Sequence, residues 1–144
     1  KGLELVPDTR WTIVHDGARP FVEPGMIARG LVQARETGAA VAAVPVTDTI
    51  KSVDDRMEVT GTLDRDRLWS VQTPQVFDTE LLLRAHAEVS DDVTDDASMV
   101  EAISNPVRVF MGSYENLKIT TPEDLVLAES IYETQQEKLS EALG

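Results

Sequence analysis

Residues 11–20, WTIVHDGARP, contain a short apolar run that ends abruptly in a carboxylate, a glycine, an arginine and a proline. The run from Trp11 to Val14 is too short for a helix and too apolar for an exposed loop, so we expect a buried strand. Asp16 and Arg19 would then lie at its carboxyl end, where open α/β sheets bind ligands. An Asp there can hold a divalent cation and an Arg can bind a phosphate. Alternatively, the two side chains only pair within a polar turn, for which Asp-Gly is a common signal.

A strand–helix–strand unit follows from the next residues. Pro24 suits the first position of a helix, apolar residues recur with helical spacing over 24–37, and Gly38 is a plausible stop. Residues 39–46 are almost all apolar and predict a second buried strand. A right-handed crossover would make the two strands a parallel pair, which indicates an α/β fold.

The pattern changes over residues 48–68, which we call the arm. Polar and apolar residues alternate on both sides of a predicted turn at 54–56, as in a β-hairpin. A two-stranded hairpin is only marginally stable alone, so we expect it to pack on something, and a second subunit is a reasonable candidate. Residues 70–77 then predict a third strand or an extended segment, broken at Pro74.

The rest of the chain continues the alternation of helices and strands. We expect a helix capped by Asp78 or Thr79 and running to 87, a helix over 94–103 capped by Thr94, strands over 107–111 and 117–119, and a long helix over 122–143. We expect the last helix to turn its apolar side inward, namely Leu125, Leu127, Ala128, Ile131 and Tyr132.

The composition narrows the function classes. The chain has 144 residues with 42% hydrophobic and 27% charged residues, as in ordinary globular domains. There is no cysteine, which excludes disulfides and thiolate sites, and no run of about 20 apolar residues that could span a bilayer. We therefore expect a cytoplasmic protein that does not bind membranes.

The net charge of −13 argues against nucleic-acid binding. An acidic protein that handles phosphates must concentrate its cations locally or recruit a metal.

Five stretches of the chain occur in the order found in 2-C-methyl-D-erythritol 4-phosphate cytidylyltransferases, and the chain resembles this family over nearly its whole length. They are residues 14–20 (VHDGARP), 45–51 (PVTDTIK), 72–77 (QTPQVF), 94–98 (TDDAS) and 116–125 (NLKITTPEDL). The resemblance implies a Rossmann-like three-layer nucleotidyltransferase fold with a mainly parallel sheet and a protruding β-arm. It also implies cytidylyl transfer from CTP to methylerythritol phosphate, with release of pyrophosphate, on the non-mevalonate route to isoprenoid precursors.

The resemblance assigns roles to residues near the first strand and near the last helix. Asp16 matches the carboxylate that holds Mg²⁺ against the CTP phosphates, and Lys118 matches a lysine beside the phosphates of the transition state. We therefore expect both to be catalytic. Arg19, with the backbone of Gly17 and Ala18, matches the lip that contacts the sugar phosphate. Taken alone, Arg19 is more often a surface ion pair and Lys118 an outward-facing strand residue.

Further substrate contacts are implied elsewhere. Thr49 and Arg65 match residues of an arm that reaches across a homodimer to the substrate of the partner subunit, although Arg65 alone reads as a solvated charge. Thr73 matches a substrate-side position, and Glu115 lies near the acidic substrate contact of the family. His15 reads as structural, because the reaction needs no general base of that kind. Residues 94–98 read as a structural cap that supports the site.

One expected feature of the family is missing. The family begins with a glycine-rich loop around the CTP phosphates, whereas the eight glycines of this chain are scattered and form no such loop. We therefore expect these 144 residues to be the C-terminal part of a single longer domain, which needs an N-terminal segment to bind CTP. Two alternatives remain open: a ribitol-5-phosphate cytidylyltransferase, and a non-catalytic dimerisation module that lost the nucleotide-binding half.

Overall fold

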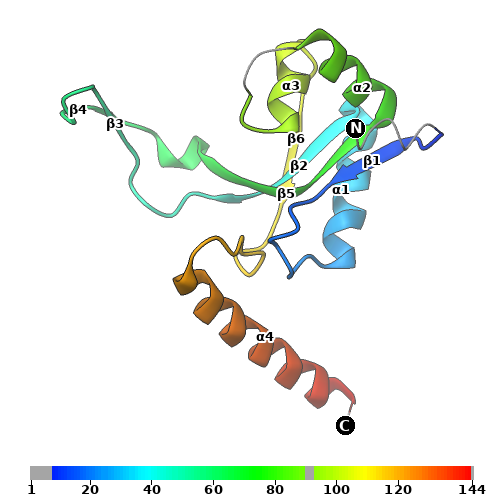
Figure 1. Cartoon of the computed structure of the whole chain (residues 1–144), viewed down its shortest axis with the longest axis vertical. Helices are drawn as coiled ribbons and strands as arrows, with labels where there is room; N and C mark the ends of the chain where they lie inside the picture. Colours follow the sequence, from blue (N-terminus) through cyan, green and yellow to red (C-terminus); the bar gives the residue numbers. More distant parts are fainter. Residues whose placement is uncertain (1–7, 90–92, 144) are drawn as a thin grey trace.

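The computed structural model describes residues 8–89 and 93–143 and shows helices on both faces of a central sheet (Figure 1). In chain order the elements are β1 (Trp11–Val14), α1 (Pro24–Thr37), β2 (Ala39–Pro45), β3 (Lys51–Val53), β4 (Val59–Thr62), the 3-10 helix η2 (Arg65–Arg67), β5 (Trp69–Asp78), α2 (Thr79–Glu88), α3 (Asp96–Ala102), β6 (Arg108–Met111) and α4 (Pro122–Leu143). None of the described helices is long and apolar enough to cross a membrane.

The central sheet is mixed, with the strand order β1-β5-β2-β6. Strands β1 and β2 both pair antiparallel with β5, and β2 pairs parallel with β6, so three of the four strands run in one direction. This confirms the expected α/β fold. The prediction that β1 and β2 are neighbours was wrong, because β5 inserts between them. The strand–helix–strand pattern predicts that β1 and β2 run in the same direction, and they do. It cannot reveal that β5, which comes from a later part of the chain, lies between them and pairs with both.

Strand β2 divides the core into two layers because its residues alternate between the faces of the sheet. Ala40 and Ala42 pack with Met26 of α1, whereas Ala39 and Val41 pack on the face that α2 and α3 cover. The alanines let the helices approach closely on both sides, which explains why β2 reads as an unbroken apolar run. The three-layer arrangement is therefore confirmed.

The ends of the first helices follow the sequence signals. Helix α1 begins at Pro24 and ends at Gly38, whose left-handed backbone (φ 82°) lets its N–H donate to the Ala34 carbonyl. Helix α2 is capped by Asp78, one of the two residues expected there. Strand β5 runs through Pro74 without a break.

Two local predictions were wrong. The cap of α3 is Asp95 and not Thr94, because the Asp95 carboxylate accepts from the Ser98 N–H at 3.0 Å. Residues 117–119 form no strand; the Ile119 N–H instead donates to the Ala18 carbonyl at 2.9 Å. The Ile119 bond joins residues far apart in the chain, whereas the Asp95 cap joins residues only three apart and replaces the neighbouring cap that the sequence suggested.

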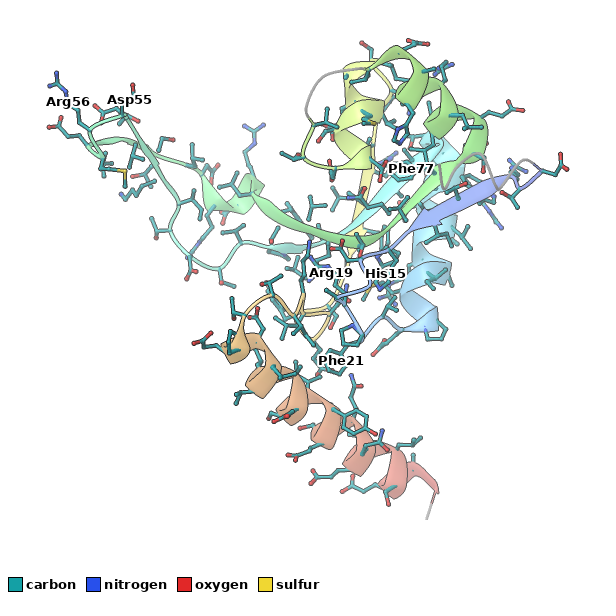
Figure 2. All side chains as sticks on the ribbon, viewed as in Figure 1. His15, Arg19, Phe21, Asp55, Arg56 and Phe77 are labelled. Carbon is teal, nitrogen blue, oxygen red and sulfur yellow. The ribbon has the colours of Figure 1, made fainter. Side chains whose placement is uncertain are left out.

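The arm projects away from the sheet, and Figure 2 shows its tip, with Asp55 and Arg56, far from His15 and Arg19. The predicted hairpin is confirmed as the pair β3–β4. Its turn is held by Asp54, whose carboxylate accepts from the Arg56 and Glu58 N–H groups at 2.9 Å each. Neither β3 nor β4 packs extensively on another described element.

Helix α4 also extends from the body of the molecule (Figure 1). Of its predicted inward side chains only Ala128 is buried; Ile131 is partly covered, whereas Leu125, Leu127 and Tyr132 are more than half exposed. The expectation of a buried face was wrong for this chain. Helical spacing reveals an apolar stripe but not whether another element covers it.

Candidate active site

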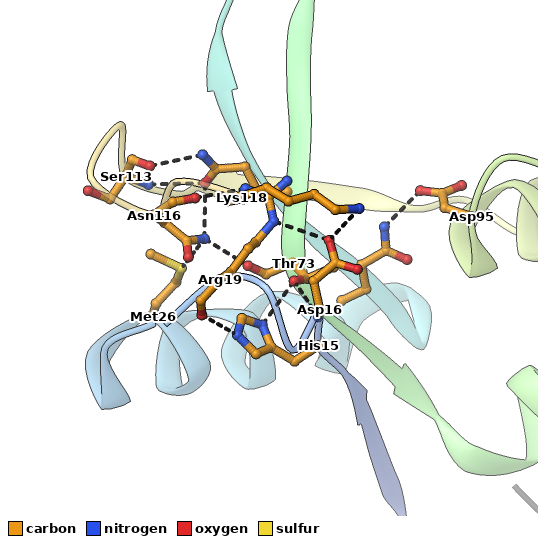
Figure 3. A network of polar contacts seen from close by, with 11 residues as sticks. His15, Asp16, Arg19, Met26, Thr73, Asp95, Ser113, Asn116 and Lys118 are labelled. Atoms are coloured by element: carbon orange, nitrogen blue, oxygen red, sulfur yellow. Dashed lines mark hydrogen bonds and ion pairs between the residues drawn. The ribbon is translucent and has the colours of Figure 1, made fainter. Parts of the chain in front are cut away.

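Asp16 and Arg19 lie in the turn that directly follows β1. The Arg19 N–H donates to the Asp16 carbonyl at 3.0 Å and closes the turn. The Asp16 carboxylate contacts two cations through the same oxygen, Oδ2: Arg19 Nε at 3.3 Å and Lys118 Nζ at 3.2 Å (Figure 3). Two cations and one carboxylate thus converge at the carboxyl end of β1, where the sequence placed Asp16 and Arg19. The pairing of Asp16 with Arg19 is also the arrangement expected for a polar turn, so the binding roles of these residues stay predictions.

The two cations set the charge state of Asp16. Partial burial by itself raises the pKa of this carboxyl, but the hydrogen bonds and positive charges of Lys118 and Arg19 outweigh it and lower the pKa below its usual value. Asp16 is therefore a carboxylate at neutral pH. Lys118 remains about half exposed and Arg19 is mostly covered, so the lysine is the cation that an incoming anion meets more freely.

Asn116 brings Lys118 to this place. Its side chain is fully buried, and its Nδ2 donates to the Thr73 carbonyl at 2.8 Å and to Gln72 Oε1 at 3.3 Å. Its own carbonyl accepts from Arg19 Nη1 at 2.7 Å. The loop after β6 is therefore bound both to β5 and to the Asp16 turn. The sequence analysis did not single out Asn116 or Gln72. The signal that could have revealed them is that each is an amide residue next to an apolar residue within or beside a motif.

The same loop needs a glycine where it leaves β6. A Cβ added to Gly112 would collide with Gln72 Oε1 and press on the Ala43 carbonyl. The space is taken because the Gln72 amide bonds the loop twice, donating to the Ser113 carbonyl at 2.9 Å and accepting from its N–H at 3.3 Å. Gly112 thus allows the close approach that anchors the loop.

Thr73 of β5 lies beneath the turn. Its Oγ1 accepts from the Asp16 N–H at 3.0 Å and lies 2.9 Å from His15 Nδ1. On the same side of β5, Gln75 Nε2 donates to Asp95 Oδ2 at 2.7 Å, which ties the cap of α3 to the strand (Figure 3). This agrees with the structural role expected for residues 94–98.

Other predicted residues lie apart from the Asp16 cluster. Thr49 is exposed on the arm, and Arg65 donates to the carbonyl of Thr47, the residue just before the arm, at 3.0 Å. Glu115 faces α4, with Gln135 Nε2 at 3.2 Å and Lys138 Nζ at 3.9 Å. No hydrogen bond or ion pair found among the described residues joins these three side chains to Asp16.

Gly17 and Ala18 form the middle of the turn. Gly17 is exposed, with no atom within 4 Å of the position of a Cβ, and the Ala18 carbonyl accepts the Ile119 N–H at 2.9 Å. The turn is therefore open on one side and tied to the Lys118 segment on the other. This leaves the Gly17 backbone accessible to a ligand.

The Asp16 cluster offers a divalent metal one carboxylate ligand. Within residues 8–89 and 93–143 there is no group of three or more His, Asp or Glu side chains that could hold an ion by themselves. Asp16 supplies a single partly exposed carboxylate. Mg²⁺ characteristically uses one or two carboxylates and completes its shell with water and substrate phosphates, so a single Asp16 fits this ion but not a protein-only metal cage.

The fold and the site together define the class of protein to which this chain belongs. An α/β sheet that presents an ionised carboxylate and two cations at the carboxyl end of a strand is suited to binding phosphate groups. The sequence model of the family described as 2-C-methyl-D-erythritol 4-phosphate cytidylyltransferase (IspD) matches residues 1–134. The chain belongs to this family.

Similar proteins and solved structures carry the same name as the family. The 2-C-methyl-D-erythritol 4-phosphate cytidylyltransferase of Desulforamulus reducens is 50% identical over 133 residues, covering 90% of this chain and 57% of that protein. The protein of the same name from Pelotomaculum thermopropionicum is 47% identical over 145 residues, with 99% and 61% coverage. The solved cytidylyltransferase from Thermus thermophilus superimposes with a TM-score of 0.81 at 40% identity, over 91% of this chain and 65% of that one. The chain thus spans about 57 to 61% of the length of these curated relatives.

Proposed function

We propose that this chain is part of an enzyme that transfers a cytidylyl group from CTP to 2-C-methyl-D-erythritol 4-phosphate and releases pyrophosphate, in the synthesis of isoprenoid precursors. The observation that carries the proposal is the Asp16 carboxylate held between Arg19 and Lys118 in a member of this family. Both substrates carry phosphate groups, and we propose that the protein acts in the cytoplasm, where nucleoside triphosphates are found.

The reaction asks the protein mainly for positioning and charge neutralisation. A phosphate oxygen of the sugar phosphate attacks the α-phosphorus of CTP, and the bond to the pyrophosphate leaving group breaks. The nucleophile is already an anion, so no general base is required. We propose that Lys118 neutralises charge on the phosphates of the transition state. Arg19, oriented by its bond to the Asn116 carbonyl, would bind the sugar phosphate together with the Gly17 and Ala18 backbone.

We propose that Asp16 holds Mg²⁺ in the working enzyme. The ion supplies charge neutralisation and alignment for the CTP phosphates when it is bound. Asp16 is suited to this task because its lowered pKa keeps it ionised and its side chain is about one third exposed. The two cations keep the carboxylate in place in the absence of other ligands.

We propose that the arm forms a homodimer and carries Thr49 and Arg65 to the substrate of the partner subunit. The hairpin of the arm packs extensively on no other described element, and it exposes apolar side chains that a partner could cover: Val53, Met57 and Val59 are 47%, 78% and 61% exposed. Removing residues 48–68 should yield a monomer by light scattering. A truncated protein that stays dimeric would contradict this proposal.

The function is tested by pyrophosphate release from the protein as prepared, with CTP, Mg²⁺ and methylerythritol phosphate, and with ribitol 5-phosphate as the comparison substrate. In a preparation that binds CTP, we expect release with methylerythritol phosphate and little with ribitol 5-phosphate; the opposite preference would overturn the substrate assignment. We also propose that CTP binding needs an N-terminal segment beyond these residues. Release that begins only when the upstream segment is added would support this, and none in either case would favour a non-catalytic module.

A further inference from the structure

His15 is bonded through both of its ring nitrogens. Nε2 lies 3.0 Å from the Arg19 carbonyl oxygen, and Nδ1 lies 2.9 Å from Thr73 Oγ1 (Figure 3). A peptide carbonyl can only accept, so Nε2 must carry a proton. In the neutral ring Nδ1 then has no proton and is an acceptor, and the Thr73 hydroxyl must donate to it. Rotating the ring by half a turn would present carbon atoms to both partners.

These bonds take up most of the hydrogen-bonding capacity of the Thr73 hydroxyl. A hydroxyl has one proton and two lone pairs. The proton goes to His15 Nδ1, and one lone pair accepts the Asp16 N–H at 3.0 Å. What remains is a single lone pair, which can accept a hydrogen bond but cannot donate one.

We propose that His15 is a positioning residue. As the Nε2–H tautomer it sets the direction of a hydrogen-bonded chain that runs from the Asp16 N–H through the Thr73 hydroxyl to the imidazole and on to the Arg19 carbonyl. Thr73 is consequently an acceptor only. This step rests on the proposed function and specifies a substrate contact: Thr73 accepts from a hydroxyl of the sugar and does not bind its phosphate, which is mainly a dianion without a proton at neutral pH.

The chain of bonds explains why this turn keeps its shape. It links the two ends of the turn, Asp16 and Arg19, to each other through β5, and both ends also carry the charged groups of the site. Removing the imidazole would leave the Arg19 carbonyl and the Thr73 hydroxyl without these partners. A displacement of about 1 Å at a positioning residue can cost about 100-fold in rate.

The tautomer is tested directly by nitrogen-15 NMR of the imidazole rings in the labelled chain, at a pH at which the rings are neutral. The chain has two histidines, His15 and His86, and a His86→Asn variant assigns the signals. We expect a protonated Nε2 and an unprotonated Nδ1 for His15. Thr73→Val should move the Nδ1 signal and Thr73→Ser should not. A His15 ring protonated on Nδ1 would overturn the proposal, whether or not the protein turns over substrate.

The positioning role is tested by kinetics on an active preparation that contains this chain. His15→Ala should lower kcat/KM for methylerythritol phosphate by about 100-fold. The side-chain oxygen of His15→Asn can replace the Nδ1 acceptor and restore part of the positioning, so this variant should be about tenfold more active than His15→Ala.

Thr73→Val should raise KM for the sugar phosphate and not for CTP, and Thr73→Ser should restore it. A fully active His15→Ala, or a His15→Asn no better than His15→Ala, would contradict the role. Absence of turnover even after the upstream segment is added would count against the proposed function and leave the NMR result to decide the tautomer.

Discussion

The Asp16 turn and the arm both carry residues that sequence motifs single out, yet they are held in different ways. At the turn, Arg19 and Lys118 come from segments far apart in the chain and meet at one carboxylate oxygen. On the arm, Thr49 is exposed, and Arg65 donates to the Thr47 carbonyl at the base of the arm. This chain alone therefore fixes the geometry of the turn, whereas the arm residues depend on something outside it for a binding role.

Packing explains the difference. Asn116, with its fully buried side chain, and the strands beneath it surround the turn with backbone and amide partners. The hairpin of the arm has two short strands and no layer of described structure behind it. An isolated hairpin is only marginally stable, so an arm that works as part of a site needs a surface to pack on.

Asp16→Asn should have the largest effect. The amide keeps the size of the side chain but removes the negative charge between Arg19 and Lys118, and with it the proposed metal ligand. We expect turnover in an active preparation to fall on the order of 10³-fold, as for the loss of a major electrostatic contact in an active site. The bond from the Asp16 N–H to Thr73 is made by the backbone, so the melting temperature should change little. Near-normal Mg²⁺-dependent turnover would refute the metal role.

A matched pair of leucines compares the stability of the core with that of the arm. Leu82 is fully buried against β2 and α3, and Leu63 of the arm is 43% exposed. Leu82→Ala should lower the free energy of unfolding by about 2–5 kcal/mol, and Leu63→Ala by about 0.5 kcal/mol or less. Urea unfolding at low protein concentration measures both. A loss for Leu63→Ala that grows with protein concentration would indicate that a partner covers the arm.

Arg65→Ala tests whether the arm reaches a substrate. Loss of a charge-assisted hydrogen bond costs about 1.5–3 kcal/mol, so KM for methylerythritol phosphate should rise about 10- to 100-fold while KM for CTP stays nearly constant. Arg67→Ala is the matched control, because Arg67 is an exposed arginine in the same 3-10 helix. If both substrates or both variants respond equally, the arm does not contact the sugar phosphate in the proposed way.

The smallest effect is expected at the start of α4. Asp124 accepts hydrogen bonds from the backbone and hydroxyl of Thr120 and from the Thr121 N–H, which lower its pKa from 3.8 to about 2. Because the pKa is lower in the folded state, the stabilisation is present above about pH 4 and is lost as the pH falls towards 2. The amide NMR signals of Thr120 and Thr121 should shift over this range. In Asp124→Asn that step should be absent, and its persistence would mean that another group causes it.

Local sequence signals were sufficient for most elements of the fold. Helix α1 begins at a proline and ends at a glycine because each residue has a backbone preference that needs no distant partner. The alternation of the arm predicted a hairpin for the same reason. The resemblance to the family assigned roles to Asp16, Arg19 and Lys118 before any geometry was known, and these roles stay predictions, as do those of the arm residues and of Glu115.

Long-range contacts decided what the sequence could not. The sequence by itself determined the α/β class, most strand and helix positions and the charged residues of the turn, because these follow from periodicity, caps and motif spacing. Only the tertiary structure placed β5 between β1 and β2 and left most of the apolar side chains of α4 exposed. Only the tertiary structure joined His15 and Asn116 to the site, both through hydrogen bonds to Thr73. The reason is that a buried polar group takes whichever partner the completed fold brings near, and that partner can lie anywhere along the chain.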